Sequence, residues 1–123
     1  MLSLEYKKFN HKVSGAIEVL DSKLTTFDTR YPHAPRNEYE ISINHWENNP
    51  TVRNFYAGGK AVSFRIRVQS TNIGFTDLGT YEGFGMRGCT ADTIDEAKGL
   101  IAKRIAEFDA RYWLLKMYTF PWG

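Results

Sequence analysis

The sequence predicts an α+β fold: a single domain, residues 1–123, in which an antiparallel sheet of about five or six strands is covered on one face by one long helix. Segments with a strand-like period of two fill most of the chain, and an amphipathic helical segment follows in the C-terminal half. No internal repeat or low-complexity run divides the sequence. Strands that precede a helix, rather than alternating with helices, are typical of the α+β class, and a chain of this length fits one domain.

The first two strands are predicted near the N-terminus. Leu2, Leu4 and Tyr6 alternate with polar residues, and a second segment, partly β-branched, runs over residues 13–20. The two segments are expected to form a hairpin that turns near Asn10.

Three further segments are predicted before the middle of the chain. Residues 24–27 are expected to be extended. Residues 30–37 are expected to form a loop, because Pro32 and Pro35 cannot donate hydrogen bonds to a strand ladder. Residues 47–60 are expected to form a long connection, since asparagine, proline and paired glycines there are turn signals.

Two strands with alternating residues flank that connection. The strand at residues 39–46 places alternate side chains on one face, and the strand at residues 61–69 alternates strictly between apolar and polar residues. The residues expected to share a face are Tyr39, Ile41, Ile43 and His45 in the first strand, and Val62, Phe64, Ile66 and Val68 in the second. Arg65 and Arg67 therefore project together from the opposite face of the second strand.

The long helix is predicted to begin at Thr93. Thr93 and Glu96 have the spacing of a capping box, in which each side chain accepts a hydrogen bond from a free backbone N–H at the helix end. Apolar residues then recur at helical spacing for about five turns. These residues are Ala97, Ile101, Ile105, Phe108 and Tyr112.

Basic residues are concentrated in the central strands, although the net charge of the whole chain is only +2. Residues 50–90 hold five basic and two acidic side chains. Arginine binds phosphate through its planar fork and stacks on bases, and such side chains together with aromatic platforms suit single-stranded nucleic acid. We therefore expect a nucleic-acid-binding face made by Arg53, Lys60, Arg65, Arg67 and Arg87, with Tyr81 and Phe84 as stacking residues. The alternative is a solvated face whose arginines pair across strands with Glu40 or Glu82.

The stretch TYEGFGMRGC, residues 80–89, allows three interpretations. Gly83-Phe84-Gly85 resembles the central strand of RNA-recognition modules, although Glu82 stands where that strand has a basic residue. The glycine spacing also matches a phosphate-binding loop, but the expected helix starts five residues beyond Gly88. The interpretation we favour is a strand in which the glycines permit a bulge or close packing before the helix.

An aromatic tail suggests a protein interface as a second function. Trp113, Tyr118, Phe120 and Trp122 lie close to the C-terminus, and tryptophan and tyrosine are enriched in interfaces. The second hypothesis is therefore a protein-binding module or inhibitor, of the phage or mobile-element type that blocks host machinery. It would use residues 30–38, residues 47–60 and the tail, and a homodimer through the tail is one form of it.

Other chemistries have no support in the sequence. The histidines at positions 11, 33 and 45 are far apart, and Cys89 is the only cysteine, so we expect no metal or other cofactor. No set of catalytic residues can be assembled from the spacing, which makes a non-enzymatic role the expectation. The N-terminus lacks a signal-like apolar run, and no apolar segment is long enough to span a bilayer. We therefore expect a cytoplasmic protein without a membrane partner.

Overall fold

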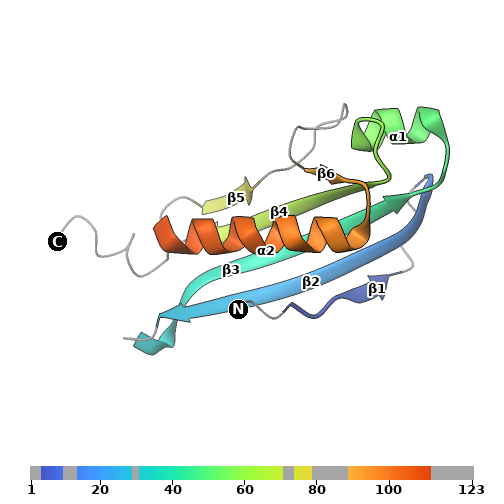
Figure 1. Cartoon of the computed structure of the whole chain (residues 1–123). Coiled ribbons are helices and arrows are strands. Elements are labelled where there is room, and N and C mark those ends of the chain that lie inside the picture. Colours follow the sequence, from blue (N-terminus) through green and yellow to red (C-terminus); the bar gives the residue numbers. More distant parts are fainter. Residues whose placement is uncertain (1–3, 10–13, 29–30, 71–73, 79–88, 112–123) are drawn as a thin grey trace.

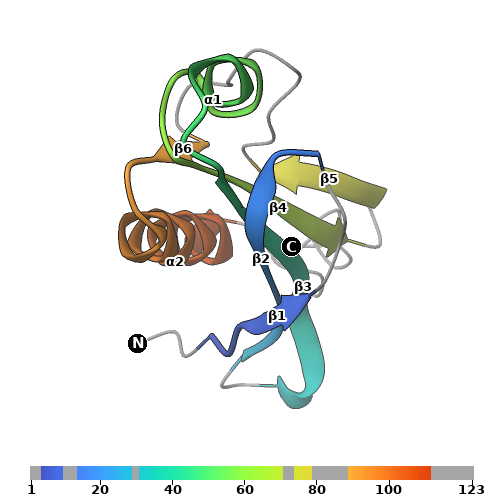
Figure 2. The same cartoon turned by 90° about the vertical axis from the view of Figure 1, so that its right-hand side faces the viewer.

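The computed structural model describes residues 4–9, 14–28, 31–70, 74–78 and 89–111, and the structural statements below concern these ranges. One antiparallel sheet is packed on one face by a long helix, which confirms the predicted α+β fold (Figures 1 and 2). The strands are β1 (Lys7–Phe9), β2 (Ala16–Asp28), β3 (Tyr31–Trp46), β4 (Val62–Ser70), β5 (Gly74–Leu78) and β6 (Thr90–Ala91). The helices are α1 (Pro50–Ala57) and α2 (Ile94–Arg111).

The first five strands form a meander in which neighbours in sequence are neighbours in space. Its order is β1-β2-β3-β4-β5, and β6 pairs with the beginning of β4, through Val62 and Ser63. All pairs are antiparallel. Residues that face each other across strands lie on the same side of an antiparallel sheet. The register therefore assigns every strand residue outside the bulges to one of two faces.

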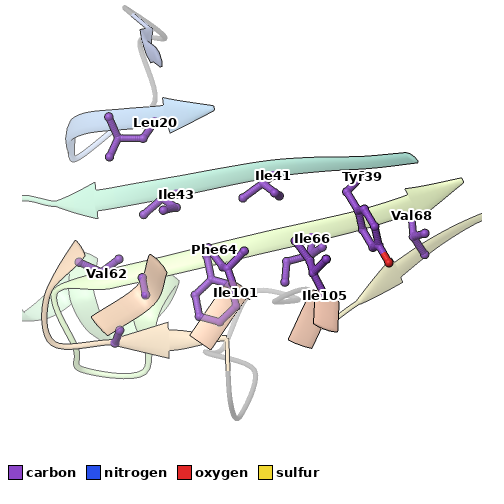
Figure 3. Packing of buried hydrophobic residues seen from close by; sticks show 12 residues of the cluster. Leu20, Tyr39, Ile41, Ile43, Val62, Phe64, Ile66, Val68, Ile101 and Ile105 are labelled. Atoms are coloured by element: carbon purple, nitrogen blue, oxygen red, sulfur yellow. The ribbon is translucent and has the colours of Figure 1, made fainter. Parts of the chain in front are cut away.

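The helix α2 buries the apolar face of the sheet. The predicted alternation in β3 and β4 is confirmed, because the even-numbered apolar residues of β4 and the odd-numbered ones of β3 are buried against α2 (Figure 3). The core cluster comprises Leu20, Tyr39, Ile41, Ile43, Val62, Phe64, Ile66, Val68, Ala91, Ala97, Ile101 and Ile105. Burial of such side chains from water is the main driving force for this packing.

The expected cap of α2 is present. The backbone N–H of Glu96 donates to Thr93 Oγ1 at 3.1 Å, as the capping box requires. The Glu96 carboxylate turns back to accept from the N–H of Asp92 at 3.3 Å, one residue earlier than in the standard arrangement. Asp95 and Glu96 also place negative charge in the first turn, where the helix dipole favours it. The sequence prediction of the helix start is thus confirmed.

The loop expected at residues 30–37 is wrong, because β3 begins at Tyr31. Residues 31–37 have β2 as their only strand partner among the described residues, since pairing of β3 with β4 starts at Glu38. A strand that has a neighbour on only one side tolerates proline. The missing backbone N–H then belongs to the side on which no strand lies. The register shifts near Phe27 show that the ladder is nevertheless irregular there. The end of the β2–β3 hairpin thus extends beyond the rest of the sheet (Figure 1).

The long connection expected at residues 47–60 is also wrong, because it contains α1. Asn49 is the N-cap of α1: its side-chain oxygen accepts from the N–H of Thr51 at 2.9 Å. Pro50 occupies the first helical position, where its missing N–H costs nothing. Gly58, at a φ of 60°, ends the helix in the left-handed conformation that favours glycine. α1 lies at the end of the sheet where β3 stops and β4 begins (Figures 1 and 2).

Candidate functional site

The sheet surface opposite α2 carries most of the charged strand residues, and we call it the open face. Its members come from five neighbouring strands and belong to the register rows that alternate with the core rows. The charged and polar positions on it include Lys7 of β1, Asp21, Lys23 and Thr25 of β2, Glu38, Glu40 and Ser42 of β3, Arg65 and Arg67 of β4, and the register position of Asp77 in β5. Lys23, Glu38 and Glu40 are exposed, whereas both arginines are half-buried.

One row of the open face alternates in charge across four of these strands. Lys23 lies opposite Glu40, Glu40 lies opposite Arg67, and Arg67 lies opposite Asp77. We call these four residues the charge row. Opposite charges at directly facing positions of a sheet attract each other weakly. The charge row therefore alternates in sign from strand to strand and has a net charge of zero.

Among the described residues predicted to bind nucleic acid, Arg65 and Arg67 are brought together. Arg65 and Arg67 share the open face, two positions apart on β4, as the alternation predicted. Arg67 faces Glu40, which is one of the two carboxylates proposed as cross-strand partners in the alternative interpretation. Ser42, which is uncharged, faces Arg65. The two arginines are thus embedded in a mixed-charge surface.

Two further predicted binding residues, Arg53 and Lys60, lie outside the strands of the sheet. Arg53 belongs to α1, and its guanidinium donates to the backbone carbonyls of Glu47 at 3.0 Å and Trp46 at 3.3 Å, so it holds the chain between β3 and α1. Lys60 is exposed in the turn that follows α1. Outside the described residues lie Tyr81, Phe84 and Arg87 and the tail residues Trp113, Tyr118, Phe120 and Trp122.

An aromatic stack joins α1 to the end of the sheet. The rings of Trp46 and Tyr56 are stacked with centroids 4.2 Å apart, and Phe55 meets Tyr56 edge-on at 4.7 Å. Trp46 is fully buried, and its indole N–H donates to Ser63 Oγ at 2.9 Å. Phe55, at the other end of the stack, is 44% exposed. This cluster was not predicted from the sequence, because the helix α1 was not predicted.

A buried polar cluster fastens the end of α2 to the sheet. Asp109 is 7% exposed, and its Oδ1 accepts hydrogen bonds from three side chains. The donors are Tyr39 Oη at 2.5 Å, Asn37 Nδ2 at 2.8 Å and Thr26 Oγ1 at 3.2 Å. A buried carboxylate is tolerated when such donors replace water. One feature of the sequence could have revealed this cluster. Asp109 lies four residues after Ile105 and therefore on the side of α2 that faces the core.

Cys89 is a free cysteine and is fully buried. Arg104 of α2 donates from Nη1 to Cys89 Sγ at 3.4 Å, and its guanidinium carbon lies 5.3 Å from the centroid of Phe64. The same side chain therefore covers the thiol and packs over an aromatic core residue. This arrangement gives Arg104 a clear packing role within the domain.

The described part of the chain also bears on metal binding and on insertion into a membrane. Among the described residues, no group of three or more histidine, cysteine, aspartate or glutamate side chains is arranged to hold a metal ion. In the same part of the chain, neither helix is long and apolar enough to cross a membrane. Comparison with known proteins found no matching family model, no matching curated protein and no matching solved structure.

Proposed function

We propose that the chain is a protein-binding module whose contact surface is the open face. The observation that carries this proposal is the alternation of charge along Lys23, Glu40, Arg67 and Asp77. A patterned but neutral surface gives specificity through matching charges on a partner. Another protein can present such a pattern, whereas a polyanion presents only one sign of charge.

The state of the arginines supports the same proposal. Arg65 and Arg67 are half-buried in the sheet surface, so less side-chain freedom remains to be lost when a partner binds. Arginine is also enriched at protein interfaces, where its long side chain supplies packing as well as charge. The inhibitors of host machinery that the sequence suggested are one class of such protein-binding modules.

The test is affinity capture from a nuclease-treated host lysate with a charge-reversed variant. We expect Arg67→Glu to lose proteins that the unchanged chain retains, because the introduced glutamate would repel the acidic group that a complementary partner places against Arg67. Lys103→Glu is the matched control, since it makes the same change of charge at an exposed position on α2. Retention of the same proteins by Arg67→Glu would remove the open face as the contact surface.

Single-stranded nucleic acid is the second candidate partner. The observation that favours it is the common orientation of Arg65 and Arg67 on β4, an inner strand. Phosphate binding predicts an affinity that falls steeply with salt. Titration of labelled single- and double-stranded DNA and RNA at two salt concentrations, with Arg65→Ala/Arg67→Ala as the variant, tests this candidate. Failure of the unchanged chain to bind at low salt would exclude it.

A further inference from the structure

We infer that the open face binds a second copy of the chain, so that two sheets pack face to face across the charge row. This inference rests on the proposed function, because it names the partner of the same surface. Its basis is the order of the four charges. Positive and negative positions alternate from β2 to β5, so the row read from one end is opposite in sign to the row read from the other.

A two-fold axis that is parallel to the strands and midway between β3 and β4 brings each position of the charge row against a position of opposite charge in the second copy. Rotation about that axis places β3 of one copy against β4 of the other, and β2 against β5. Glu40 then faces Arg67 of the second copy, and Lys23 faces the position of Asp77. Because the interface is symmetric, each of these contacts occurs twice. The strands of the two sheets remain aligned, as in sandwiches of packed sheets.

The neighbouring rows are compatible with the same axis. Ser42 would face Arg65 of the second copy, which places a hydroxyl acceptor near a guanidinium. In the row on the other side, Glu38 would face the position of Gln69. In these two rows, the facing positions on β3 and β4 therefore bring no like charges into opposition around this axis.

Other arrangements of the two copies form fewer contacts between opposite charges or bring like charges together. A two-fold axis that runs through the charge row, across the strands, would place each charge against its own copy and produce repulsion. An axis midway between β2 and β3 would pair Lys23 with Glu40 but would leave Asp77 outside the overlap. The sequence of charges thus selects one relative orientation of the sheets.

The association should be weak and sensitive to salt. Lys23 and Glu40 are exposed, and ion pairs between exposed side chains contribute little each. Four such contacts correspond to a dissociation constant on the order of 1 mM at low salt. The dimer should therefore be measured at high protein concentration and low ionic strength.

Sedimentation velocity with two single charge reversals tests the inference. We expect the unchanged chain to form a dimer, and expect Arg67→Glu and Glu40→Arg each to weaken dimerisation at least about tenfold, because each creates like-charge contacts. A mixture of the two variants should regain the dimer, since the two glutamates of one variant would then face the two arginines of the other. Lys103→Glu is the control and should dimerise normally. Native mass spectrometry with one variant isotopically labelled identifies the mixed species.

Folding of the variants is checked by circular dichroism and urea unfolding. Where a reversal unfolds the chain, Arg67→Gln and Glu40→Gln replace it and should each weaken the dimer. The inference is overturned if the unchanged chain stays monomeric, if the dimer is indifferent to these substitutions, or if the mixture of reversals does not associate. The proposed function survives a monomeric result if capture of another protein still depends on Arg67. It fails independently if neither the dimer nor any captured protein depends on Arg67.

Discussion

The phenolic hydroxyl of Tyr39 on β3 donates a hydrogen bond of 2.5 Å to Oδ1 of Asp109, in the last turn of α2. Asn37 and Thr26 donate to the same oxygen. This single acceptor therefore connects the C-terminal end of α2 with two strands. Phe108 packs edge-on against the ring of Tyr39 at the same place, so this end of the helix is held by apolar and polar contacts together.

We expect Asp109→Ala to lower the free energy of unfolding by about 3 kcal/mol, because three donors would lose their common acceptor in a buried place. Tyr39→Phe removes one donor and should cost about 1 kcal/mol. Urea unfolding followed by circular dichroism measures both effects. Glu107→Ala, at an exposed position of the same helix turn, serves as the control. Equal effects of Asp109→Ala and Glu107→Ala would contradict a stabilising role for the cluster.

Two glycine-to-alanine substitutions should act in opposite directions. Gly15 has a φ of 85°, and an added Cβ would lie 2.6 Å from Cγ1 of Val52 in α1. Gly15→Ala should therefore destabilise the fold by about 2 kcal/mol through backbone strain and overpacking. Gly99→Ala should stabilise it by about 0.5–1 kcal/mol, since Gly99 is helical and has open space around it. Thermal unfolding compares the two.

A second substitution separates the causes at Gly15. Val52→Ala removes the two methyl carbons nearest to the added Cβ. If steric overlap contributes, Gly15→Ala should cost less in the Val52→Ala background than in the unchanged chain. An identical cost in both backgrounds would assign the whole effect to the backbone conformation.

Trp46→Phe tests the anchor beneath α1. Phenylalanine keeps an aromatic ring against Tyr56 but loses the indole N–H that donates to Ser63 Oγ, which is fully buried. We expect a loss of about 1–3 kcal/mol in urea unfolding, because the Ser63 hydroxyl would lose this partner. Adding Ser63→Ala should recover part of that loss. A strictly additive double mutant would show that the two groups are not coupled.

Alkaline pH should weaken the fold through Tyr6. Burial raises the pKa of Tyr6 from 10.0 to about 12. Well below pH 10 the hydroxyl is protonated in both the folded and the unfolded state, so stability does not change with pH through this group. Between about pH 10 and 12 the unfolded chain releases this proton before the folded chain does, so the free energy of unfolding falls as pH rises. Since Tyr6 is only half-buried, the loss should be no more than about 1 kcal/mol.

The Tyr6 prediction is measured by comparing unfolding at about pH 9 and pH 11 in the unchanged chain and in Tyr6→Phe. The variant should lose less stability over this interval, because its unfolded state has one fewer phenol to ionise. The Nζ of Lys98 lies 5.0 Å from the centre of the Tyr6 ring. Because Lys98 is present in both proteins, its contribution to stability is largely removed by the comparison. An equal decline in both would contradict the assignment.

The alternation of apolar and polar residues and the helix-capping residues predicted the centre of the fold correctly. The alternation at residues 39–46 and 61–69 identified the faces of β3 and β4, and the Thr93 and Glu96 pair located the start of α2. These signals are local, so they can be read from neighbouring residues. The helix α1 was missed because Asn49, Pro50 and Gly58 are turn residues as well as helix-terminal residues, and a helix of eight residues leaves little periodicity between them.

The open face could be predicted only in part. Alternation showed that Arg65 and Arg67 share a face, and Glu40 was named as a candidate neighbour. The complete charge row depends on the register of three strand pairs, which no local pattern specifies. The cluster at Asp109 was missed for a related reason, because its donors come from strands 70 or more residues earlier in the chain.

The charge row has a consequence for how β3 and β4 find each other during folding. A slip of two residues keeps every side chain on its own face. In one such slipped pairing, Glu38 would meet Arg67 and Glu40 would meet Arg65, giving two oppositely charged pairs in place of the one that the native register gives. Electrostatics alone would thus favour the competing pairing. The native pairing must be selected instead by the core under α2 and by the Trp46–Ser63 hydrogen bond.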